Sequence, residues 1–90
     1  MPLTLRRDRE HSNEHYDVFA GKWHCGIIRN EAHHLAAHVP PWRWIIHLGG
    51  SSPPGVIRDD RAETLEAAKA AFADNWRKWI AHMGLREVDG

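Results

Sequence analysis

The sequence has a single cysteine, Cys25, so no disulfide can form within the chain. It has no apolar run near 18 residues, the length that a membrane-spanning helix needs. The first residues also lack the apolar stretch of a secretion signal. These absences predict a cytoplasmic protein that works in a reducing compartment and has no membrane partner.

Neither sign of charge is in excess, because Lys plus Arg and Asp plus Glu both total 12 and the formal net charge is zero. A domain dedicated to nucleic-acid binding usually has a pI above about 9. Nucleic-acid binding is therefore not favoured for the chain as a whole, although a local basic strip remains compatible with this composition.

Signals of catalysis are scarce as well. The glycine-rich segment LGGSSPPG (48–55) is not followed by Lys and Ser or Thr, as a phosphate-binding loop would be. Cys25 has a histidine beside it, but it falls on the predicted core face, where a free cysteine behaves as a small hydrophobic residue. We therefore expect a non-enzymatic protein without a cofactor.

Aromatic residues are abundant for a chain of 90 residues, which has five tryptophans, two phenylalanines and one tyrosine. Each large aromatic side chain can bury about 150–250 Å². A short chain buries a small share of its surface and needs a dense core, which these side chains can supply. The sequence shows no internal repeat and no second domain, so we expect one domain over 1–90.

The clearest periodicity lies in the C-terminal half and predicts a helix over about 64–83. Apolar residues recur there at steps of three and four, which places them on one face of a helix. They are Leu65, Ala68, Phe72, Trp76, Trp79, Ile80 and Met83. Thr64 suits the N-cap, and Gly84 with Leu85 suits a C-terminal cap.

The N-terminal half predicts strands within 2–58, separated by loops at 8–15 and 30–41. Alternation in WRWIIHL gives one apolar face. This face comprises Trp42, Trp44, Ile46 and Leu48. Alternation in KWHCGIIR likewise directs Trp23, Cys25 and Ile27 toward the core, and His24, Gly26 and Ile28 away from it.

Together these elements predict an α+β fold, with an antiparallel meander of three to four strands and one long C-terminal helix packed on one sheet face. The helix must bury its apolar stripe, and one face of the sheet is the surface available for it. We therefore expect the tryptophans of the WRWIIHL strand to meet Phe72, Trp76, Trp79 and Ile80 of the helix.

Histidine is unusually frequent, and three of the eight histidines cluster at His33, His34 and His38. His34 and His38 are four residues apart, as in many zinc-binding pairs. A structural zinc site needs four nitrogen or sulfur ligands, however, and the sequence has no C-x₂-C pair. The prolines after Val39 also end any helix soon after His38. We favour a polar connector and keep these three histidines as weak candidates for metal binding.

A sheet covered by one helix leaves its other face open. Alternation places Arg43 and His47 there, with His24 from the neighbouring strand and Arg6 from the first, beside Ile45 and Ile28. We predict that Arg6, His24, Arg43 and His47 contact an unknown protein partner or a second copy of the chain. The alternatives are weak nucleic-acid binding by the same four residues and an ordinary solvated face.

The order WRWIIHL … TLEAAKAAFADNW, within about 16–83, resembles AP2-type and integrase arm-type DNA-binding domains, in which three strands precede one packed helix. The Thr-Leu-Glu-x-Ala helix start is similar to that of HicB-type antitoxin domains. The whole layout looks most like small uncharacterised bacterial β-meander-plus-helix proteins. The first resemblance implies basic and aromatic residues on the open sheet face, and the second implies a toxin partner.

Overall fold

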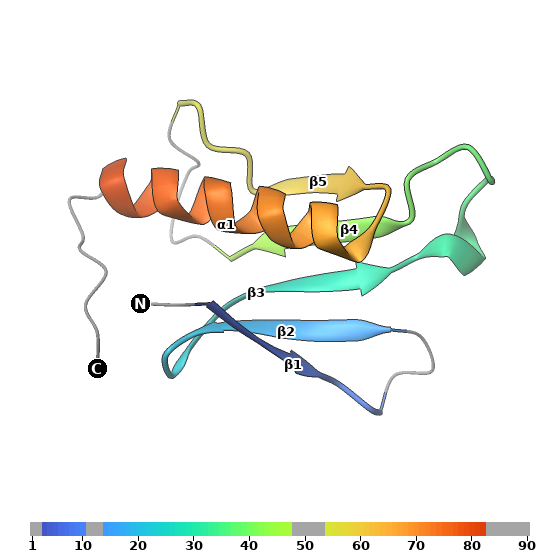
Figure 1. Cartoon of the computed structure of the whole chain (residues 1–90), viewed down its shortest axis with the longest axis horizontal. Helices are drawn as coiled ribbons and strands as arrows, with labels where there is room; N and C mark the ends of the chain where they lie inside the picture. Colours follow the sequence, from blue (N-terminus) through green and yellow to red (C-terminus); the bar gives the residue numbers. More distant parts are fainter. Residues whose placement is uncertain (1–2, 11–13, 48–53, 83–90) are drawn as a thin grey trace.

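The computed structural model describes residues 3–10, 14–47 and 54–82. Five strands form one antiparallel sheet in sequence order, and one helix packs against it (Figure 1). The elements are β1 (Leu3–Arg7), β2 (His15–Ala20), β3 (Trp23–Asn30), a short 3-10 helix (Ala32–His34), β4 (Trp42–Ile46), β5 (Asp59–Ala62) and α1 (Leu65–His82). The α+β class is confirmed, and the sheet is wider than the three to four strands predicted.

The strand β5 lies beyond the range of 2–58 that the sequence predicted for strands. Its residues, DDRA, show no apolar alternation and so carry no strand signal. β5 pairs with β4 through its backbone, with Trp42 opposite Ala62 and Ile45 opposite Asp59. Backbone pairing does not require apolar side chains, and a charged edge strand discourages further strand addition.

The helix α1 begins one residue after the predicted start because Thr64 acts as its N-cap. The amide of Ala67 donates a hydrogen bond to Oγ1 of Thr64 at 3.0 Å. α1 is described as far as His82. The predicted last residue, Met83, and the predicted C-terminal cap at 84–85 lie outside the described residues.

The core lies between α1 and the sheet. α1 crosses β4 and also contacts β5 and β3 (Figure 1). The Trp44 and Phe72 rings meet edge to face at 6.3 Å between centroids, and the Trp76 and Trp79 rings are 5.2 Å apart. The predicted meeting of the tryptophan strand with the helix stripe is confirmed for the described residues, which exclude Leu48. Among the described residues, no helix has both the length and the apolar character to cross a membrane.

The strand β3 departs from simple alternation. Its register with β2 shifts between Val18 and Phe19, so that Val18 pairs with Gly26 and Phe19 with His24. This β-bulge places Cys25 between the two pairs, where it is fully buried.

Beyond the bulge the two faces of β3 are exchanged relative to the prediction. Ile28 pairs with Trp44 and is fully buried, whereas Ile27 pairs with Ile45 on the opposite face. The predicted placement of Ile27 in the core and of Gly26 and Ile28 on the open face was therefore wrong. The physical reason is that alternation counts every residue, while a bulge inserts one residue without a cross-strand partner.

The two predicted loops are each slightly shorter than expected. β2 already begins at His15, and β3 extends to Asn30. Between β2 and β3 the chain turns through Gly21 and Lys22, and Gly21 has a φ of 62°. Glycine adopts this left-handed conformation at little cost, which makes it suited to a two-residue hairpin turn.

Candidate functional site

The sheet face that α1 does not cover is the candidate site, and we call it the open face. Its side chains come from alternate positions of all five strands and form cross-strand rows. Beginning at β1, they are Thr4, Arg6, His15, Asp17, Phe19, His24, Ile27, Arg29, Arg43, Ile45, Asp59 and Arg61. His47 directly follows β4, and its ring contacts that of His24 on this face.

Three of the four residues predicted for this surface lie in one chain of contacts. The guanidinium of Arg6 stacks over the Phe19 ring at 5.2 Å. The Phe19 ring lies 5.2 Å from the His24 ring, which in turn meets the His47 ring at 5.4 Å. The sequence did not indicate Phe19 as a member of this group. It becomes the link between Arg6 and the histidines because the bulge aligns it with His24.

Arg43, the fourth predicted residue, lies apart from this group and is held by acids. Its Nε and Nη2 atoms donate to the two carboxylate oxygens of Asp59 at 3.0 and 2.6 Å. The row that contains Arg43 also contains Arg29 on β3 and Arg61 on β5. These arginines surround Glu31, with Arg29 Nε 2.6 Å from Oε2 and Arg61 Nη2 2.6 Å from Oε1.

These ion pairs lower the pKa values of the two carboxyl groups, as positively charged partners should. Partial burial acts to raise the pKa of Glu31, but the hydrogen bonds from Arg61 and Arg29 outweigh it, and the pKa lies below its ordinary value. The hydrogen bonds from Arg43 likewise lower the pKa of Asp59, and partial burial opposes them. Asp59 in turn raises the pKa of Arg43. Both carboxylates are therefore ionised at neutral pH, and they offset much of the arginine charge.

We call Arg29, Glu31, Arg43, Asp59 and Arg61 the arginine cluster. Of these five residues, Arg43 alone was predicted for the open face. Glu31 falls in a predicted loop, Asp59 and Arg61 lie beyond the predicted strands, and Arg29 ends the predicted strand KWHCGIIR without a partner suggested for it. A usable signal was present in Arg29 and Glu31, since two residues with this spacing on an extended chain point the same way. The position of Arg61 could not be inferred without knowing that β5 exists.

Apolar side chains occupy the middle of the open face. Ile27 and Ile45 are directly opposite each other on β3 and β4, and both are half-buried. Phe19 on β2 is also half-buried. The open face therefore has an apolar centre, with the arginine cluster on one side and the contact between His24 and His47 on the other.

The loop histidines that were weak candidates for a metal site belong to no group of possible ligands among the residues that the structure describes. His33 and His34 lie in the 3-10 helix with their rings 3.7 Å apart, and both are exposed, as is His38. Within the described ranges, one set of three side chains has atoms close enough to hold a metal ion. It consists of Asp8, His15 and Asp17.

The thiol of Cys25 is buried between the sheet and the helix and is not part of the open face. It donates a hydrogen bond to the carbonyl oxygen of Val18 at 3.4 Å. Burial raises the pKa of Cys25 to about 11. A thiol must be deprotonated to act as a nucleophile, so this environment does not favour covalent catalysis.

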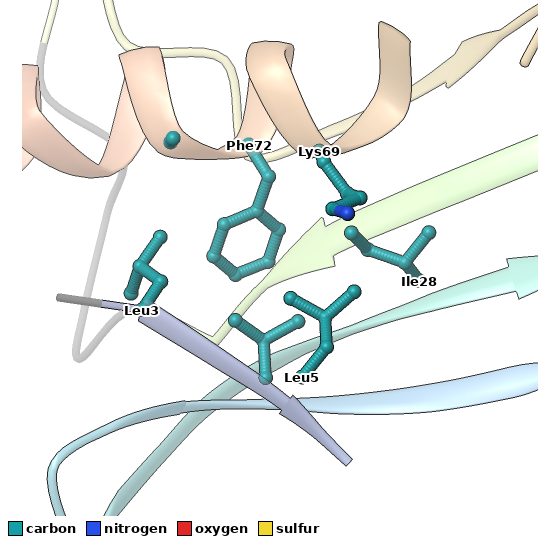
Figure 2. Close-up of a pocket in the computed structure, with 7 residues that line it drawn as sticks. Leu3, Leu5, Ile28, Lys69 and Phe72 are labelled. Atoms are coloured by element: carbon teal, nitrogen blue, oxygen red, sulfur yellow. The ribbon is translucent and has the colours of Figure 1, made fainter. Parts of the chain in front are cut away.

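A shallow apolar groove lies on the other side of the sheet, between β1 and α1. Figure 2 shows Leu3 and Leu5 of β1 facing Phe72 and Lys69 of α1, with Ile28 at the base. The groove encloses about 170 Å³. Pockets for drug-sized ligands usually have about 300–1,000 Å³. The groove is therefore too small to be the main candidate site.

Comparison of the chain with protein-family models, with curated proteins and with solved structures finds no match. The side chains of the open face are therefore the basis for assigning a function.

Proposed function

We propose that this chain is a small non-enzymatic domain that acts through a protein–protein contact on the open face, in its simplest form with a second copy of itself. The observation that carries the proposal is the apolar centre formed by Phe19, Ile27 and Ile45. These side chains are half-buried, and no helix or sheet of the described chain covers them, although the Arg6 guanidinium lies over the Phe19 ring. Covering apolar surface is the main favourable contribution to association.

The charges around this centre favour a protein as the partner. In the arginine cluster, Glu31 and Asp59 compensate the guanidinium groups before any partner arrives. A paired charge can be covered by another protein at a smaller desolvation cost than an isolated one. The single buried cysteine also fits a reducing compartment such as the cytoplasm.

The size of the face predicts a weak contact. Five strands about 4.8 Å apart, each with about five residues at about 3.3 Å, give an area of about 400 Å². A standard interface covers about 800 Å² on each partner. We therefore expect a dissociation constant in the micromolar range or weaker.

Sedimentation velocity from about 1 μM to about 1 mM tests the contact. We expect a reversible dimer that Ile45→Lys weakens at least about tenfold, because it places a charge at the apolar centre. Ile57→Lys is the matched control. Ile57 is 50% exposed and its amide is bonded to Asn75 of α1, away from the open face. A monomer throughout this range, or equal weakening by both variants, contradicts the proposal for a second copy.

The alternative use of the same face is weak nucleic-acid binding. It is favoured by the three arginines that lie side by side on β3, β4 and β5, and by Arg6 next to the two histidines. Glu31 and Asp59 oppose it, because they already occupy the guanidinium groups. Titration with short duplex DNA at about 50 and 200 mM salt distinguishes the two functions, since binding through phosphates weakens steeply with salt. Absence of binding at the lower salt concentration excludes this alternative.

A further inference from the structure

We propose that Asp8, His15 and Asp17 form a binding site for a divalent transition-metal ion such as Zn²⁺ at the end of the β1–β2 hairpin. The sequence did not predict this grouping, because 8–15 carries the pattern of a loop and Asp17 that of a strand. The site does not depend on the proposed contact between protein molecules. Its test below measures metal binding alone.

The backbone brings the three side chains together. His15 and Asp17 are two residues apart on β2, so they project from the same face of the sheet. The amide of Asp8 donates a hydrogen bond to the carbonyl oxygen of His15 at 2.8 Å, which fixes Asp8 beside the start of β2. The site is therefore anchored by strand pairing, which holds its backbone in place.

The potential ligand atoms lie somewhat farther apart than the ligands of one bound ion. One ligand atom from each of the three residues lies within 4.8 Å of the other two. Nε2 of His15 is 3.7 Å from Oδ1 of Asp17. Two ligands at about 2.1 Å from a tetrahedral ion are about 3.4 Å apart. Small side-chain rotations are therefore enough to close the set around a cation.

Partial burial of the three side chains favours the binding of a cation between them. All three residues are half-buried, and the side chain of His15 is 13% exposed. Two carboxylates brought close together away from water repel each other, and a cation between them removes this repulsion. Among the described residues, Asp17 contacts two imidazoles, those of His15 and His24, and no arginine contact to it is found. A metal ion would not have to break a strong arginine–carboxylate pair at this residue.

Two arginines that are paired with residues of the site have contacts elsewhere. Arg6 is opposite Asp17 on β1, but its guanidinium stacks over Phe19. Arg29 is opposite His15 on β3, but its guanidinium donates to Glu31. Their positive charge lowers the affinity of the site for a cation.

His24 completes the surroundings of the site. Its Nε2 is hydrogen-bonded to Oδ1 of Asp17 at 3.0 Å, and such an outer contact holds a ligating carboxylate in position. One imidazole with two carboxylates is a donor set that suits Zn²⁺, Mn²⁺ or Co²⁺. Mg²⁺ and Ca²⁺ prefer ligand sets made of oxygen atoms alone. Three protein ligands also leave at least one coordination position for water or for a group from a partner.

Isothermal titration of the reduced protein with Zn²⁺, in a buffer that does not chelate the ion, tests the site. We expect one ion per chain and a Kd at least about tenfold weaker in Asp8→Asn and Asp17→Asn, which keep the size of each side chain. His24→Ala should weaken binding less than either substitution. Imidazole resonances of His15 should shift in NMR spectra on addition of Zn²⁺.

The control is the double variant His33→Ala with His34→Ala, which removes two exposed imidazoles from the loop. It should bind Zn²⁺ as tightly as the natural chain. Far-UV circular dichroism of each variant confirms that the fold is intact. The proposal is overturned if the natural chain does not bind Zn²⁺ at about 1 mM. It is equally overturned if Asp8→Asn and Asp17→Asn leave the affinity unchanged, or if only the loop variant loses it.

Discussion

Gly26 lies directly under the ring of Phe72, so closely that a methyl group at position 26 would come within 2.6 Å of the ring carbons. The same methyl group would also overlap the carbonyl oxygen of Ile45 on the neighbouring strand. The absence of a side chain at Gly26 therefore allows the helix and the sheet to approach each other closely. This contact is possible because the bulge turns Gly26 toward α1.

We predict that Gly26→Ala destabilises the domain by about 3 kcal/mol, at the upper end of the usual cost of overpacking. The backbone at Ile45 cannot move aside as easily as a flexible side chain could. Urea denaturation followed by tryptophan fluorescence measures the change in the free energy of unfolding. A loss below about 0.5 kcal/mol would mean that α1 does not approach the sheet this closely.

The buried tryptophans should dominate the stability of so small a core. Trp44 and Trp76 are each 2% exposed, and we expect Trp44→Ala or Trp76→Ala to cost about 3–5 kcal/mol. Trp23→Ala is the matched comparison, because Trp23 also packs on Trp76 but is 47% exposed. It should cost clearly less in the same denaturation experiment. Equal losses for Trp23 and Trp44 would contradict the assignment of the core.

The thiol of Cys25 should react slowly in the folded protein. With a pKa of about 11, it has a thiolate fraction at neutral pH about two orders of magnitude below that of an exposed cysteine. Ellman's reagent added at pH 7.5, with and without guanidinium chloride, compares the folded and unfolded rates. Similar rates in the two conditions would show that the thiol is accessible.

The ion pairs of Glu31 should stabilise the domain at neutral pH and fail in acid. The folded-state pKa of Glu31 is lowered, so its contribution is complete above the ordinary carboxyl pKa of about 4 and is lost as the pH falls through the folded value. We expect Glu31→Gln to cost about 2 kcal/mol at pH 7, because two charge-assisted hydrogen bonds are weakened.

Thermal unfolding of the natural chain and of Glu31→Gln between pH 7 and pH 2 checks this dependence. The difference in stability between the two proteins should shrink below about pH 4. Glu66→Gln is a suitable control, because Glu66 is an exposed residue on α1 whose bond to Lys69 is long, at 3.5 Å. A constant difference across the whole range would contradict the role of the Glu31 charge.

Local patterns were sufficient for α1, for its Thr64 cap and for the apolar face of β4. In each case the periodicity of the apolar residues reports directly which side must be buried. β5 escaped prediction because DDRA is stabilised by the backbone of β4 and has no apolar face of its own. Ile27 and Ile28 were assigned to the wrong faces because the bulge at Cys25 shifts the register.

The residues of the open face also divide into what the sequence predicts and what only the structure shows. That Arg6, His24, Arg43 and His47 share a face follows from strand alternation. Which of them touch does not, because contacts between strands depend on register. The spacing of apolar residues along the chain thus determines the helix, the class of the fold and most of the core. Pairing between distant segments determines which side chains are in contact. It brings Arg43 to Asp59, places Phe19 between Arg6 and His24, and brings Asp8 and Asp17 close to His15.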